Sequence, residues 1–226
     1  MSNVLVKNEV DMEDQVEVVA KPWSDSPYYE DAERWTHLFW EDSTIFRSMF
    51  ERMDLTATLE LACGHGRHAE QCVDRTGSLV VMDIFQDNLD ISLARLPVDG
   101  SVSSHKNDGH TFNPIADASL TAIFCYDAMV HFSPDIVESY IKDAVRVLKP
   151  GGKALFHHSN YPAPLDQHYG QNPHARNHMT KELFQTLCDK HGMNVVESQV
   201  MGWGGVEGLD CVTLMQKDYS VTGRLR

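Results

Sequence analysis

The feature that most constrains the fold is a regular alternation of short apolar runs and amphipathic stretches along residues 57–158. The apolar runs have the length of buried strands, and the stretches between them carry apolar residues at helical spacing. Such alternation is typical of a mostly parallel sheet with helices on both faces. Strands are expected at 57–62, 79–82, 101–106, 120–126 and 153–158, and helices at 67–75, 86–96 and 134–148.

The last part of the chain predicts how this sheet ends. Thr180 is typical of a helix N-cap and Gly192 of a helix end, and two further strands are expected at 194–201 and 211–216. The turn-rich segment 202–208 is so short that these strands can only be antiparallel neighbours or a local excursion of the chain. We therefore predict an α/β fold with a doubly wound, Rossmann-like sheet of seven strands, mostly parallel with an antiparallel last strand.

The segments before and after this region differ from it in composition. Acidic residues dominate the start of the chain, whereas Ser26 and Pro27 are typical of a helix start and are followed by aromatic residues at helical spacing. Four parts are expected: an acidic tail that could be disordered (1–25), a helical lid (26–56), the main domain (57–218) and a C-terminal tail (219–226).

Composition excludes several classes of function. With 33 acidic and 19 basic residues the net charge is −14, which repels phosphate backbones, so nucleic acid is not an expected partner. No apolar run approaches the roughly 20 residues of a membrane helix. Residues 1–20 lack the pattern of a secretory signal, so a cytoplasmic protein without membrane contact is expected. The five cysteines form no CxxC pair, which argues against disulfides and a thiolate zinc site.

A glycine-containing turn follows the first predicted strand. Gly64 and Gly66 lie in this turn, where a missing side chain lets a ligand approach backbone N–H groups. Together with Ala69 they also satisfy the G-x-G-x-x-G/A spacing of dinucleotide enzymes. This turn alone therefore does not separate a nicotinamide cofactor from other adenosine ligands.

Two carboxylates and three downstream segments favour a different cofactor. Glu60 precedes the turn, where it suits a cationic ligand better than a pyrophosphate. Asp83 closes the second strand, where a carboxylate can accept hydrogen bonds from ribose hydroxyls. The downstream segments are Asp108-Gly109 after the third strand, 126–132 after the fourth and 149–152 before the fifth.

In this combination the chain resembles the class I S-adenosylmethionine-dependent methyltransferases over residues 57–217. The resemblance implies S-adenosylmethionine as the cofactor, with S-adenosylhomocysteine as its product. The residues that it implies for cofactor binding are Glu60, Ala62, Gly64 and Gly66 at the methionine end, Tyr126 at the sulfonium, and Asp83, Ile84, Asp108 and Gly109 at the ribose and adenine. Ala62 departs from the family pattern, which usually has its first glycine there. Glu60 could instead cap the next helix, and Asp108-Gly109 is also a common turn dipeptide.

Candidate catalytic residues follow from the chemistry of methyl transfer. A base is needed only if the nucleophile starts protonated, and histidine suits that role near neutral pH. His131 and His158 are the candidates, with Asp127 as a partner, although structural roles for these histidines are equally open. Only one of His157 and His158 can face the ligand, because adjacent strand residues point to opposite faces.

Acceptor contacts are expected from the lid and from the loop after the fifth strand. The candidates are Tyr28, Trp35, His157, Asn160, Tyr161, Arg176 and Asn177. Histidines crowd this loop, but none pair on a predicted helix, so no metal site is expected. The expected function is methyl transfer to an oxygen or nitrogen of a small-molecule acceptor, with a homodimer as an open possibility. The alternatives are a nicotinamide-dependent oxidoreductase and a non-catalytic cofactor-binding module.

Overall fold

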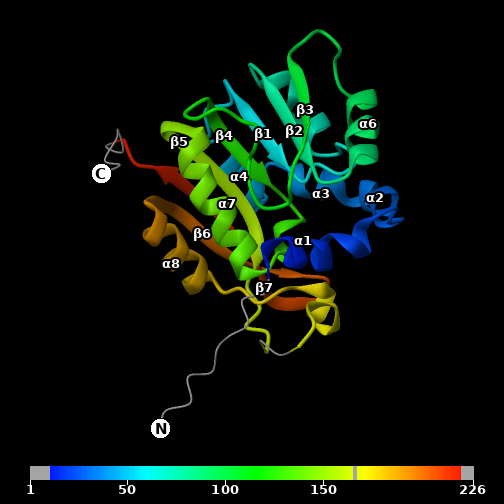
Figure 1. Ribbon diagram of the computed structural model, residues 1–226, viewed down its shortest axis with the longest axis vertical. Helices are drawn as coiled ribbons and strands as arrows, with labels where there is room; N and C mark the ends of the chain where they lie inside the picture. The colour runs from blue at the N-terminus through cyan, green and yellow to red at the C-terminus, as the bar shows by residue number, and fades with distance from the viewer. Residues whose placement is uncertain (1–10, 165–166, 220–226) are drawn as a thin grey trace.

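The computed structural model describes residues 11–164 and 167–219, which form one seven-stranded sheet in the order β3-β2-β1-β4-β5-β7-β6 (Figure 1). The strands are β1 (Thr58–Leu61), β2 (Leu79–Asp83), β3 (Val102–Lys106), β4 (Leu120–Cys125), β5 (Leu148–Ser159), β6 (Met193–Trp203) and β7 (Val206–Lys217). The first five strands run parallel to one another, and β7 is antiparallel to both β5 and β6. The predicted seven-stranded, mostly parallel sheet is confirmed.

Helices cover both faces of this sheet. They are α1 (Met12–Ala20), α2 (Tyr28–Asp31), α3 (Thr36–Trp40), α4 (Ile45–Phe50), α5 (Ala69–Cys72), α6 (Gln86–Arg95), α7 (Pro134–Val147) and α8 (Lys181–His191). Side chains of β4 alternate between the faces, as its pleat requires. Ile123 and Cys125 pack in the cluster that holds α7 and α8, whereas Ala122 and Phe124 pack with α4.

The two long helices begin and end where the sequence predicts. The Ser133 hydroxyl accepts a hydrogen bond from the Ile136 N–H at 3.4 Å, and Pro134 occupies the first turn of α7. The Thr180 hydroxyl likewise accepts from the Leu183 N–H at 3.1 Å, and Gly192 ends α8 with a φ of +77°.

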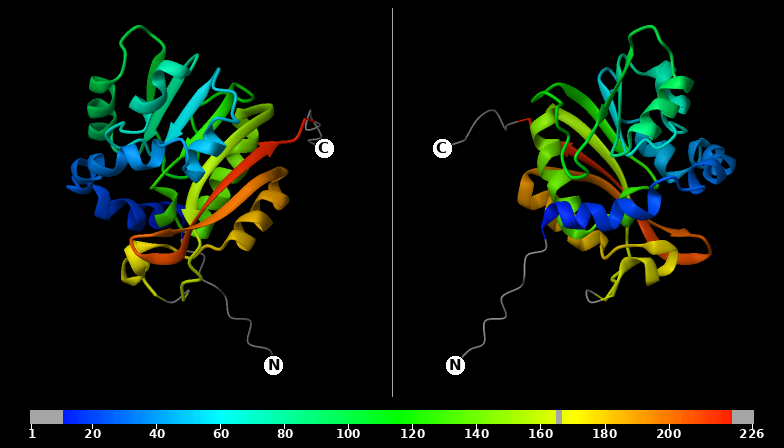
Figure 2. Two further views of the ribbon diagram at one scale, coloured as in Figure 1. Left: turned by 180° about the vertical axis from the view of Figure 1, so that it is seen from behind. Right: turned by 45° about the vertical axis from the view of Figure 1, so that its right-hand side comes forward.

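The N-terminal part of the chain differs most from the prediction. Residues 12–20 form α1, with Val16 and Val19 buried against the core, so the expected tail is folded from residue 12 onward. The lid consists of α2, a 3-10 helix at Ala32–Trp35, α3 and α4 rather than two continuous helices. Figures 1 and 2 show α1, α2 and α3 together beside the end of the sheet where β1 and β2 finish. Residues 1–10 and 220–226 lie outside the described part of the chain.

Three strand boundaries also differ from the prediction. β5 begins at Leu148 and includes Pro150-Gly151-Gly152, which the prediction placed before the strand. β6 and β7 both extend to a tight turn at Gly204-Gly205. Within the described residues, no helix is long and apolar enough to cross a membrane.

Candidate functional site

A cavity of about 950 Å³, including its open mouth, lies at the carboxyl ends of β1, β2 and β4. This is the edge at which open α/β sheets bind ligands. The segments that follow these strands form its floor, and residues of α1 and α2 with the chain between them form its roof. The floor includes Ala62, Gly64, Asp83, Ile84, Asn107, Gly109, Tyr126, Asp127 and His131. The roof includes Val16, Val19, Trp23, Tyr28 and Tyr29.

The turn after β1 has a backbone that favours glycine. Ala62 has a φ of +55° and Gly64 a φ of +51°, both in the left-handed region. A Cβ at Gly64 would lie 2.9 Å from the Tyr29 ring. Gly66 has a different role, because a Cβ there would lie 2.4 Å from the Ser92 hydroxyl of α6. Ala62 and Gly64 therefore line the cavity, whereas Gly66 permits helix packing.

The Asp83 carboxylate organises this turn. Its Oδ2 accepts a hydrogen bond from the Gly64 N–H at 2.9 Å, and its Oδ1 accepts from the Phe85 N–H at 2.9 Å and the Asn88 amide at 3.1 Å. Burial raises the pKa of Asp83, and these donors oppose the rise. Oδ2 keeps one lone pair for a further donor.

Glu60 and Asp108 are not among the residues that line the cavity. Glu60 is buried below the turn, where burial raises its pKa to about 8 against the opposing influence of Arg67. The Asp108 carboxylate accepts hydrogen bonds from the His110 and Thr111 N–H groups at 3.0 and 2.7 Å, which is the turn role. Asn107 and Gly109, on either side of it, line the cavity instead.

Asp127 projects into the cavity from the end of β4. Its φ of +60° is unusual for a residue other than glycine. Its Oδ2 accepts hydrogen bonds from the Tyr28 hydroxyl at 2.5 Å and from Arg67 at 2.7 Å, and Arg67 also donates to the Ala32 carbonyl. The structure thus joins Tyr28 of the lid directly to Asp127, which also forms an ion pair with Arg67, a residue that sequence reasoning missed.

His131 also lines the cavity, with one nitrogen engaged. Its Nδ1 lies 2.8 Å from the Ala175 carbonyl, so Nδ1 carries the proton and donates it. Burial lowers the pKa of His131 to about 4, which keeps the ring neutral. The Trp23 ring lies beside it, with the ring centroids 4.5 Å apart. Nε2 is therefore a proton acceptor, and among the described residues it has no partner.

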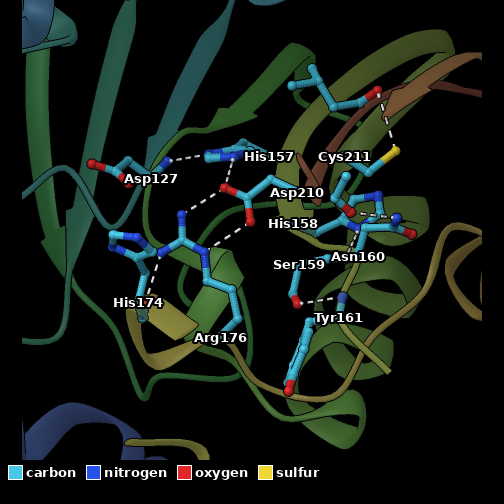
Figure 3. A network of polar contacts seen from close by, with 12 residues as sticks. Asp127, His157, His158, Ser159, Asn160, Tyr161, His174, Arg176, Asp210 and Cys211 are labelled. Atoms are coloured by element: carbon cyan, nitrogen blue, oxygen red, sulfur yellow. Dashed lines mark hydrogen bonds and ion pairs between the residues drawn. The ribbon is translucent and has the colours of Figure 1, made fainter. Parts of the chain in front are cut away.

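His158 does not reach this cavity (Figure 3). Its Nδ1 donates to the Ser159 carbonyl at 2.8 Å, and its Nε2 accepts from the Thr213 hydroxyl at 2.9 Å. The ring stacks on Phe184 of α8 at 3.9 Å, and burial lowers its pKa to about 3. The strand pleat turns His158 away from the site, so the structure does not support its expected catalytic role.

His157 points the other way, into a buried polar network behind Asp127 (Figure 3). Its Nδ1 accepts the Asp127 N–H at 3.1 Å, so Nε2 carries the proton and donates to Asp210 at 3.0 Å. Arg176 donates to both oxygens of Asp210, at 2.8 and 2.6 Å. His157 and Arg176 therefore support the floor of the cavity and do not line it.

The remaining acceptor candidates lie elsewhere. Trp35 is 42% exposed on the surface. Asn160 bonds to the Gly208 carbonyl and the Lys181 N–H, and Asn177 donates to the His131 carbonyl at 3.1 Å. Tyr161 pairs with residue 178 as an isolated bridge. Of these seven candidates only Tyr28 lines the cavity. Within residues 11–164 and 167–219, no three His, Cys, Asp or Glu side chains are grouped to hold a metal.

Comparisons with known proteins indicate the same kind of domain as the sequence motifs do. Residues 59–156 match the family model of a methyltransferase domain. No curated protein matches the sequence significantly. Among solved structures, a Haloferax volcanii methyltransferase in complex with the Trm112 methyltransferase activator has a TM-score of 0.65 at 14% identity, covering 89% of this chain and 98% of that one.

Two further structures share the fold but differ in chemistry. The geranyl diphosphate C-methyltransferase of Streptomyces coelicolor, solved with Mg²⁺, geranyl diphosphate and S-adenosyl-L-homocysteine, has a TM-score of 0.65 at 14% identity over 91% of this chain and 97% of that one. The [4+2]-cyclase SpnF has a TM-score of 0.61 at 13% identity over 90% and 94%. The family model and the shared fold agree with the resemblance: residues 59–156 match a methyltransferase domain, and the chain has the fold of S-adenosylmethionine-dependent methyltransferases.

Proposed function

We propose that this protein transfers the methyl group of S-adenosylmethionine to an oxygen or nitrogen of a small-molecule acceptor. One observation carries the proposal. A single cavity brings the turn after β1, the Asp83 carboxylate and the free Nε2 of His131 together at the ligand-binding edge of the sheet.

The residues present fit this cofactor. The left-handed turn at Ala62 and Gly64 would carry the methionine end, and the open lone pair of Asp83 Oδ2 can accept a hydrogen bond from a ribose hydroxyl. Ile84, Asn107 and Gly109 would surround the adenine. The cavity extends from the turn after β1 to His131 and Phe132, where the acceptor would lie beside the cofactor.

The chemistry divides between the cofactor and the chain. S-adenosylmethionine supplies a methyl group on a positively charged sulfonium. His131 Nε2 would take the proton that the acceptor loses, and Nδ1 stays bonded to the Ala175 carbonyl throughout. Val19, Trp23 and Tyr28 of the roof would exclude water from the reacting atoms.

Two alternatives remain as outcomes of a test. A nicotinamide cofactor could use the same glycine turn, and the similarity to a [4+2]-cyclase means that the fold alone does not decide the reaction. A cofactor-binding protein without transfer is the second alternative.

Calorimetric titration with S-adenosylmethionine, S-adenosylhomocysteine and NADH separates these functions, with thermal shift as a second readout. Micromolar binding of the first two without NADH is expected, and binding of NADH alone would overturn the proposal. Transfer is measured with radiolabelled S-adenosylmethionine and a panel of phenols, alcohols and amines. Cofactor binding without transfer to any of them would favour the non-catalytic alternative.

The Asp83→Ala variant tests the site itself. Loss of a charged acceptor for the ribose should weaken binding by about 2 kcal/mol or roughly thirtyfold. Circular dichroism establishes that the variant is folded, because Asp83 also holds the Gly64 and Phe85 N–H groups. Asp99→Ala, an exposed aspartate outside the cavity, is the matched control and should bind normally.

A further inference from the structure

We infer that the methyl acceptor is an uncharged molecule that presents two hydrogen-bond donors to the cavity, one to His131 Nε2 and one to Asp127 Oδ1. This inference rests on the proposed function and names the chemical class of its acceptor.

The Asp127 carboxylate uses only one of its oxygens within the protein. The Tyr28 hydroxyl and Arg67 both donate to Oδ2, at 2.5 and 2.7 Å. Among the described residues Oδ1 has no partner, and it is not sealed inside the protein. The Asp127 N–H donates to His157, which fixes the backbone from which the carboxylate projects. Oδ1 is therefore a fixed hydrogen-bond acceptor without a partner among the described residues, in a side chain that lines the cavity and is only 2% exposed.

His131 offers a second hydrogen-bond acceptor atom, its Nε2. Its Nδ1 is bonded to the Ala175 carbonyl, which leaves the lone pair of Nε2. This nitrogen also has no partner in the described part of the chain and is not fully enclosed, although the ring as a whole is buried. Two hydrogen-bond acceptors cannot bond to each other, so both Asp127 Oδ1 and His131 Nε2 require a hydrogen-bond donor from a ligand. A hydroxyl or amine N–H meets that requirement, and a carboxylate or phosphate oxygen does not.

The charges around this position are already balanced. Asp127 is paired with Arg67, and behind it Asp210 is paired with Arg176. A charged acceptor group placed here would lose its hydration without gaining an unpaired counter-charge from the protein. A cation that approached Asp127 would also approach Arg67. An uncharged donor avoids both costs.

The surface next to His131 and Asp127 is mostly apolar, apart from the Trp23 indole N–H, which is buried without a hydrogen-bond partner among the described residues. Val19 and Trp23 from the roof and Phe132 from the floor line it. The Trp23 indole lies 4.5 Å from the His131 ring, so a planar molecule would meet an aromatic surface while its donors reach the two acceptors. Catechol, a small planar molecule with two adjacent hydroxyls and no charge, is the simplest probe of this arrangement.

The test uses the full chain saturated with S-adenosylhomocysteine. Catechol, 2-methoxyphenol, benzoate and benzylammonium are titrated in turn, and the Cε1–H signal of His131 is followed by NMR. Catechol should shift this signal and bind at least tenfold more tightly than 2-methoxyphenol, which lacks the second donor. Benzoate and benzylammonium should bind more weakly than either.

One variant tests the contact with His131, and a second variant is its control. His131→Phe should abolish the preference for catechol over 2-methoxyphenol without changing the affinity for S-adenosylhomocysteine, and His37→Gln, an exposed histidine of α3, should leave both unchanged. The inference is overturned by equal binding of catechol and 2-methoxyphenol, by tighter binding of either ion, or by no shift at His131. A failure to bind S-adenosylhomocysteine would instead reject the proposed function, so the two failures are distinguishable.

Discussion

At the scale of single residues, Ala62 carries a backbone cost that glycine would not. Its φ of +55° lies in a region that costs an L-residue about 1 to 2 kcal/mol, whereas glycine adopts it freely. Ala62→Gly should therefore stabilise the protein, despite the entropy that glycine adds to the unfolded chain, by a net of about 0.5 kcal/mol. Urea unfolding measures this change. Ala154→Gly, in the buried part of β5, should instead destabilise by about 1 to 2 kcal/mol. Destabilisation by both would contradict the strain argument.

Glu60 predicts an unusual dependence of stability on pH. Its folded pKa of about 8 lies above the unfolded value of 4.5, so the folded state binds more protons between these pH values. The stability of the native protein should therefore fall as pH rises through this window. Glu60→Gln cannot ionise, so relative to the native protein it should gain about 3 to 5 kcal/mol between pH 5 and pH 8. Unfolding free energies at the two pH values test this, and a constant difference would contradict it.

The sequence predicts some site residues better than others. Gly64, Asp83, Tyr126 and His131 follow strand ends, and the strand pattern alone places such residues at one edge of the sheet. Arg67 could not be assigned in the same way, because its partner Asp127 is 60 positions away and its role depends on how the lid folds back. The pleat of β5 shows the opposite case: alternation predicts that only one of the adjacent histidines faces the site, but not which one.

At the scale of elements, α1 depends on a close contact with the loop after β3. A Cβ at Gly109, whose φ is +84°, would lie 2.4 Å from Cγ1 of Val16. Gly100 has a similar φ of +88° but no atom within 4 Å, so it is a matched control for backbone strain alone. Gly109→Ala should destabilise the protein by about 1 kcal/mol more than Gly100→Ala does. Urea unfolding of both variants measures the difference.

The same contact can be tested by removing its other side. In a Val16→Ala background the extra cost of Gly109→Ala should largely disappear, because the clashing methyl groups are absent. Equal costs in both backgrounds would show that α1 does not press on this loop. Because α1 is rich in acidic residues, the sequence analysis predicted a tail there instead of a helix. Val16 and Val19, three residues apart on one face, are the signal for a docked helix.

At the scale of the whole molecule, one buried network joins segments that are far apart in sequence. Asp210 of β7 binds both His157 of β5 and Arg176 of the loop before α8, while His157 holds the backbone of Asp127 after β4. Through Asp127 the network continues to Tyr28 of the lid, 99 positions away. The alternation of strands and helices predicts the sheet that these residues stand on. It cannot predict the network, because each contact depends on the register of β5 against β7.

Asp210→Asn tests whether this network holds the fold together. The variant leaves the buried Arg176 charge without a counter-charge, so it should lower the unfolding free energy at pH 7 by about 3 to 5 kcal/mol. Asp189→Asn, on the exposed face of α8, should change it by less than about 0.5 kcal/mol.

The contacts with Arg176 and His157 lower the pKa of Asp210 to about 2, below its unfolded value of 3.8. The stabilisation is thus present above pH 4 and is lost as pH falls toward 2. The gap between the native protein and Asp210→Asn should therefore narrow over that range, and a gap independent of pH would mean that the charge of Asp210 is not what stabilises the network.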